Sequence, residues 1–142
     1  MSKISYGLAQ RAVACKEWMW MPGMRLRSLR RYLRIVGCNA DGSYRLSWDD
    51  PGRPVEGDTY TIEDLAKATP DLRDPATLGC LLALVREAWE PHRGDDSVVS
   101  TMQVGDKWGV GARYGSEGLA AIVLPAFDTE AEALVKALEA AP

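Results

Sequence analysis

Residues 74–89, DPATLGCLLALVREAW, are the stretch that decides the fold. Asp74 can cap a helix, and Pro75 suits the first helical position because its missing N–H costs nothing there. Apolar side chains then recur at helical spacing, namely Leu78, Leu81, Leu82, Val85 and Trp89. Pro91 and Gly94 end the pattern. We therefore predict an amphipathic helix against which the rest of the chain packs.

Before this helix, the chain predicts a helix, an arginine-rich segment and a hairpin. Residues 3–19 have helical apolar spacing, which Pro22 and Gly23 interrupt. Residues 25–34 hold five arginines; the alternation of apolar and polar residues there favours a strand, and the leucine spacing also fits a short helix. The turn sequence NADG precedes the returning strand, residues 43–48. Residues 49–58 are predicted to be a polar loop, followed by a short helical turn near 62–68.

After the helix, the chain predicts three strands and a last helix. The strands are residues 97–104, 107–114 and 119–124. Thr129 and Glu132 fit a capping box that opens the final helix. Because strands follow one another as hairpins, we expect the α+β class: one antiparallel sheet flanked by helices, similar to an α/β/α sandwich. The length of 142 residues suits a single compact domain spanning residues 1–142.

Composition narrows the classes of function. A net charge of −3 argues against binding nucleic acid or an anionic membrane with the whole surface. The three cysteines show no paired spacing and there is a single histidine, so we expect buried reduced thiols, no metal site and no cofactor. No apolar run reaches the roughly 18 residues that span a membrane. With no signal-peptide pattern, these features predict a cytoplasmic protein.

No arrangement of nucleophile and base predicts an enzyme. No Gly-x-Ser-x-Gly motif is present, and His92 follows a proline in a predicted loop. The pair Asp71 and Asp74 is explained by caps and turns. We therefore expect a protein without catalytic residues.

The most informative cluster runs from Trp18 and Trp20 to Arg25 and Arg27. One interpretation is a helix end whose aromatic residues close the core, with solvated arginines behind it. The other is a recognition surface, because indole faces can stack on a base and guanidinium groups can hold phosphate or carboxylate. Three further residues, Trp108, Arg113 and Tyr114, could supply a similar surface.

Three segments carry a resemblance to a known group of proteins. They are RAVACKEWMWMPGM (11–24), PDLRDPATLGCLLALVREAW (70–89) and EAEALVKALEAAP (130–142). They resemble small uncharacterised proteins of bacteriophages and prophages and, more loosely, phage ABA sandwich domain proteins, in which helices flank an antiparallel sheet. The resemblance implies a phage accessory protein made in the cytoplasm of the bacterial host.

Together these observations favour a non-enzymatic viral protein that counters host defence. The leading hypothesis is sequestration of a nucleotide-type immune signal by a homo-oligomer, with a ligand site formed by Trp18, Trp20, Arg25, Arg27, Trp108 and Arg113. The alternative is a protein-interaction module that inhibits a host defence enzyme or nuclease directly, as anti-CRISPR proteins do. A third hypothesis is nucleic-acid binding through the arginines of 25–34.

Overall fold

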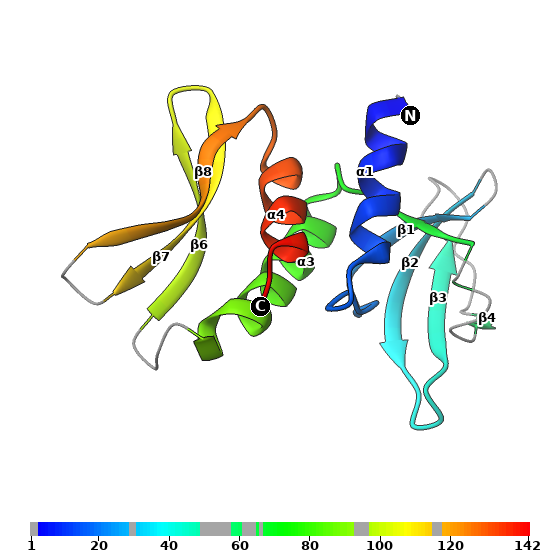
Figure 1. Ribbon diagram of the computed structural model, residues 1–142. Coiled ribbons are helices and arrows are strands. Elements are labelled where there is room, and N and C mark those ends of the chain that lie inside the picture. The colour runs from blue at the N-terminus through cyan, green and yellow to red at the C-terminus, as the bar shows by residue number, and fades with distance from the viewer. Residues whose placement is uncertain are drawn as a thin grey trace. The chain divides into compact units, whose positions relative to one another are not determined.

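The computed structural model describes residues 3–28, 31–48, 58–60, 65, 67–92, 97–114 and 118–142 (Figure 1). In chain order the elements are α1 (Lys3–Ala14), β1 (Arg25–Ser28), β2 (Arg31–Cys38), β3 (Tyr44–Trp48), β4 (Asp58–Tyr60), β5 (Thr69–Pro70), α3 (Pro75–Trp89), the 3₁₀-helix η1 (Glu90–His92), β6 (Ser97–Val104), β7 (Lys107–Tyr114), β8 (Leu119–Phe127) and α4 (Glu130–Glu139). Antiparallel strands with helices packed on them confirm the α+β class.

The chain divides into two compact units. Unit 1 comprises Met1–Val13 and Met19–Cys80, and unit 2 comprises Ala14–Trp18 and Leu81–Pro142. Each unit has its own sheet, so the strands form two sheets where the sequence analysis placed them in one. The hairpin pattern in the sequence indicates which strands are neighbours but does not say where one sheet ends and the next begins. The single domain expected from chain length stays a prediction.

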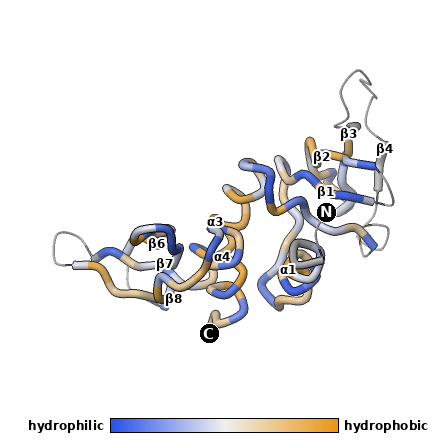
Figure 2. Tube along the Cα trace, turned by 90° about the horizontal axis from the view of Figure 1, so that it is seen from above, coloured by the Kyte–Doolittle hydropathy of each residue, from blue (hydrophilic) through white to orange (hydrophobic). Residues whose placement is uncertain are grey.

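Unit 1 contains sheet A, with strand order β4-β3-β2-β1-β5 and every pairing antiparallel. Residues 25–34 therefore belong to strands rather than a helix wherever they are described. The register sets Leu26 opposite Leu33, and Ile35 opposite Leu46, and all four side chains are buried. Helix α1 lies along this sheet (Figures 1 and 2) and buries Leu8, Ala9 and Ala12.

The turns of unit 1 follow their sequence signals. Gly42 has a φ of 87°, which favours glycine, in the turn between β2 and β3. Asp41 accepts hydrogen bonds there from the amide and the hydroxyl of Ser43. Helix α1 ends at Ala14, five residues before the predicted end, because a turn closes when the Trp18 amide donates to the Cys15 carbonyl. Most of the predicted helical turn at 62–68 lies outside the described residues.

Unit 2 contains sheet B, the antiparallel meander β6-β7-β8, against which α4 packs. Thr129 caps α4 as predicted, its Oγ1 accepting from the Glu132 amide. Strand β8 runs to Phe127, three residues beyond the prediction, with irregular register around Pro125. The core of this unit contains the following side chains: Leu81, Leu84, Val85, Val99, Val110, Val123, Leu134, Val135 and Leu138.

The outer edge of β6 is blocked at Val99. Arg86 Nε donates to the Val99 carbonyl at 2.7 Å, and the Val99 amide donates to a carboxylate oxygen of Glu90 at 3.3 Å. Both side chains come from the end of α3 and from η1, so they occupy backbone groups that a further strand would need.

Candidate functional site

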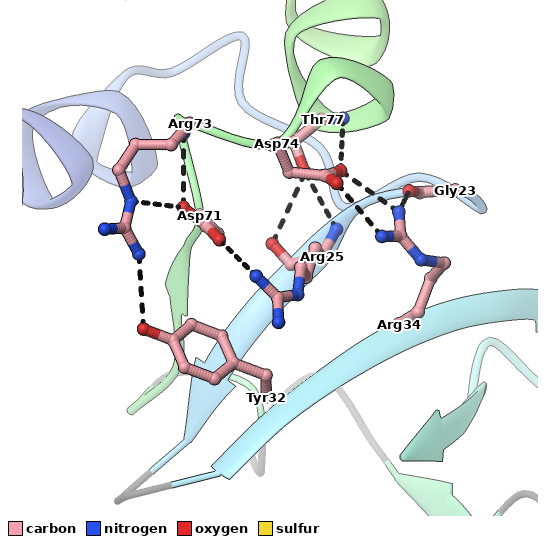
Figure 3. A network of polar contacts seen from close by, with 8 residues as sticks. All are labelled: Gly23, Arg25, Tyr32, Arg34, Asp71, Arg73, Asp74 and Thr77. Carbon is pink, nitrogen blue, oxygen red and sulfur yellow. Dashed lines mark hydrogen bonds and ion pairs between the residues drawn. The ribbon is translucent and has the colours of Figure 1, made fainter. Parts of the chain in front are cut away.

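The pairing of β1 with β2 gathers cationic and aromatic side chains on one face of sheet A. Arg25 lies opposite Arg34, and Arg27 lies opposite Tyr32. Because side chains alternate along a strand, these four share the face opposite to the buried Leu26 and Leu33 pair. We call these four residues, with Asp71 and Arg73 beside them, the arginine face; Figure 3 shows all of them except Arg27.

Asp74 joins the start of α3 to this face. Its Oδ2 accepts from the amide and the hydroxyl of Thr77, both at 2.9 Å, which caps the helix as predicted. Arg34 donates to both Asp74 carboxylate oxygens at 3.0 Å and to the Gly23 carbonyl at 2.8 Å. The hydrogen bonds from Arg34 are the largest cause of the lowered pKa of Asp74, which falls from 3.8 to about 2.

Asp71 holds two further arginines. Its side chain is only 3% exposed; Oδ2 accepts from Arg25 Nη1 at 2.9 Å, and Oδ1 accepts from Arg73 Nε at 3.2 Å. The Asp71 amide donates to the Arg25 carbonyl at 2.8 Å, and the Arg25 amide donates to Thr77 Oγ1 at 2.8 Å. This carboxylate thus fixes the direction of both guanidinium groups.

Tyr32 is the centre of the arginine face. The Arg25 guanidinium carbon lies 4.1 Å from the ring centroid, and that of Arg27 lies 5.9 Å from it. Arg73 Nη2 donates to the Tyr32 hydroxyl at 3.3 Å. Three guanidinium groups therefore surround one phenol ring.

The charges on this face are not balanced among the described residues. Asp71 serves both Arg25 and Arg73, while no ion pair joins Arg27 to a carboxylate in the described part of the chain. Within the same part of the chain, Arg27 Nε is buried without a hydrogen-bond partner. The surface therefore has the chemistry to attract an anion.

The structure brings together two of the six predicted site residues, Arg25 and Arg27. Trp20 is 7% exposed and belongs to the core of unit 1, which agrees with the core interpretation of the tryptophans. Trp18 is half-buried and belongs to unit 2. Trp108 and Arg113 lie an odd number of residues apart on β7, so they occupy opposite faces of sheet B.

Sequence reasoning missed most of the arginine face. Asp71 and Asp74 were assigned to turns and caps, which is what Asp74 does, but their arginine partners were not foreseen. These pairs join residues that are 40 or 46 positions apart along the chain. The signal available was the regular alternation of arginines with apolar residues, which fixes a common face once the strand register is known.

The cysteines are neither paired with one another nor gathered with acidic residues in the described part of the chain. None of the three cysteines, all of them described residues, forms a disulfide; Cys38 is exposed and the other two are half-buried, so the expected full burial is wrong. Cys80 donates to the Pro22 carbonyl, and burial raises the pKa of its thiol. Within the described ranges, no three Cys, His, Asp or Glu residues gather to hold a metal ion.

Comparisons of the chain with protein-family models, curated proteins and solved structures find no match. Among the described residues, no helix is both long and apolar enough to cross a membrane.

Proposed function

We propose that this protein binds and sequesters a small nucleotide-type anion, without catalysis, on the arginine face of sheet A. Arg27, Tyr32 and Arg73 are the contact residues, and Arg25 and Asp71 hold them in place. The resemblance of residues 11–24 and 70–89 to phage proteins supplies the biological setting: a counter-defence protein that removes an immune signal of the host.

The observation that carries this proposal is the set of three guanidinium groups around Tyr32. Guanidinium groups hold phosphate by two parallel hydrogen bonds, and their planar faces also stack on aromatic rings. Arg73 is 59% exposed, so its outer edge is available to a ligand in solvent. A protein that sequesters a ligand needs groups that bind it and needs no catalytic group.

A homo-oligomer is part of the proposal. A sheet face supplies one wall of a binding site, and enclosing a small ligand requires a second wall. A second copy of the chain would supply that wall without a further gene product.

Native mass spectrometry tests the proposed function directly. The purified protein is exposed to lysate of defence-activated bacteria, its mass is measured intact, and the released small molecules are analysed after denaturation. We expect a nucleotide-type ligand released unchanged, together with the mass of an oligomer. Arg73→Gln should lose the ligand. Arg45→Gln, which removes an exposed arginine opposite Gly37, five residues along β2 from Tyr32, should keep it. A chemically altered ligand would contradict sequestration.

A second candidate function rests on the outer face of sheet B. Val98, Val104 and Leu124 are exposed there, Leu124 by 72%, although they are large apolar residues. Leu119 and Met102 cover Gly111 on the same face, since a Cβ at Gly111 would lie 2.9 and 3.0 Å from them. Exposed apolar groups of this kind are typical of protein interfaces. Direct inhibition of a host protein would appear in the same mass spectra as a stoichiometric complex, which Leu124→Asp would abolish.

A further inference from the structure

The geometry points to a ligand that ends in a dianionic phosphate monoester, rather than one whose phosphates are all diesters. This inference rests on the proposed function and narrows its ligand class. It depends on how the positive charges around Tyr32 are distributed.

Of the three arginines around Tyr32, Arg27 and Arg73 provide two positive charges that no carboxylate fully balances among the described residues. Asp71 is nearly fully buried, and its shorter ion pair, 2.9 Å, is with Arg25. If the Asp71 charge is assigned to Arg25, the Arg73 guanidinium keeps its own charge at the solvent edge. Arg27 adds a second charge, because it has no carboxylate partner among the residues that the structure describes. A ligand that balances this surface therefore needs two negative charges.

The hydrogen-bond donors also match a terminal phosphate. Arg73 directs Nη2 at the Tyr32 oxygen, so the phenol accepts from the arginine and keeps its own O–H to donate. Arg27 lies on the same ring, with its Nε buried and unused by the described residues. Tyr32 thus has one guanidinium group at its hydroxyl and another over its ring. A ligand group that uses donors from both arginines and from the hydroxyl needs several acceptor atoms.

A phosphate monoester meets both requirements. It carries about −1.5 to −2 charges at pH 7 and has three strong acceptor oxygens. A phosphodiester carries a single negative charge, and two of its oxygens are tied up in ester bonds. One diester would leave one of the two arginines unneutralised, which costs affinity at a partly desolvated site.

Paired nucleotides provide the test, because each pair shares its base and sugar and differs in whether the phosphate is also esterified to the 3′ oxygen. Binding to the full-length protein is measured by calorimetry for each of the four nucleoside 5′-monophosphates and for its 3′,5′-cyclic counterpart, at pH 7.5 and low salt. We expect at least one monophosphate to bind about tenfold or more tightly than its own cyclic form. Arg73→Gln, an exposed change, should reduce that ratio at least fivefold, and Arg27→Gln should do the same; Arg45→Gln should leave it unchanged.

The outcomes separate the inference from the proposed function. Cyclic forms that bind as tightly as the monophosphates, or more tightly, would overturn the inference and leave nucleotide sequestration standing. A preference that survives Arg73→Gln would overturn the assigned site. If neither series binds and native mass spectrometry also recovers no nucleotide, the proposed function fails and the inference fails with it.

Discussion

The carboxylate of Asp74 binds both Thr77 and Arg34. It caps α3 through Thr77, accepts both guanidinium bonds of Arg34, and so joins the start of the helix to strand β2. The side chain is only 12% exposed, so water screens these contacts weakly. Protonation of Asp74 would therefore weaken both the cap of α3 and the ion pair with Arg34 on sheet A.

We predict that Asp74 makes folding stability depend on pH in acid. Its pKa is about 2 in the folded protein and near 3.8 when unfolded, so the ionised form stabilises the fold above about pH 4. That contribution, about 2 kcal/mol, is lost as pH falls from about 4 to about 2. Asp74→Asn keeps a capping side chain but should lower the free energy of unfolding at pH 7 by that amount.

Urea unfolding of the wild type and Asp74→Asn, at pH 7, 4 and 2.5, measures this effect. The gap between the two proteins should shrink as pH falls. Glu87→Gln, a change of an exposed carboxylate on the same helix, is the matched control. A gap of equal size at pH 7 and pH 2.5 would show that the charge of Asp74 is not its source.

Two glycines should respond to alanine in opposite ways. A Cβ at Gly109 would lie 2.5 Å from the Val123 carbonyl oxygen and 2.8 Å from the Pro125 nitrogen, so Gly109→Ala should destabilise the protein by about 1–3 kcal/mol. Gly79 lies in α3 with open space around it, so Gly79→Ala should stabilise the protein by about 0.5–1 kcal/mol. Thermal melting of both variants measures these changes in stability. An unchanged melting temperature for Gly109→Ala would mean that β7 and β8 leave room for a methyl group at this position.

At the scale of elements, the sequence predicts the bounds of single helices and strands better than it predicts which strands share a sheet. The strand bounds 97–104 and 107–114 and the cap at Thr129 could be predicted, because alternation and capping depend on neighbouring residues. The division into two sheets could not, because it depends on contacts between distant segments. The predicted strand ended with the apolar run at residue 124. The observed strand continues through Pro125, because β8 is an edge strand, where a missing N–H is tolerated.

The cap of α4 gives a prediction at this scale. Thr129→Ala removes the oxygen that accepts from the Glu132 amide, so it should cost about 1 kcal/mol of folding stability. Thr129→Ser retains a hydroxyl and should recover most of that loss. Urea unfolding of both variants measures the difference. An equal loss in the serine variant would assign the effect to the threonine methyl group instead.

For the whole molecule, the key feature is that α3 supplies residues to both units. Thr77 is buried in unit 1, whereas Leu81, Leu84 and Val85 are buried in unit 2. Loss of this helix would therefore expose the buried Thr77 of unit 1 and apolar core residues of unit 2.

We predict that the two units unfold in one cooperative transition. Asp74→Asn in unit 1 and Gly109→Ala in unit 2 should each move the same urea midpoint, whether unfolding is followed by tryptophan fluorescence or by far-ultraviolet circular dichroism. Two separated transitions, each moved by only one of the variants, would show that the units fold independently.

The blocked edge of β6 limits what sheet B can build. A sheet that can gain strands on both sides can grow without end when copies meet, which is how fibres form. With Arg86 and Glu90 occupying the backbone of Val99, only the β8 side remains for another copy. Strand-to-strand growth through sheet B would then stop at a pair, so these two side chains protect this sheet against polymerisation.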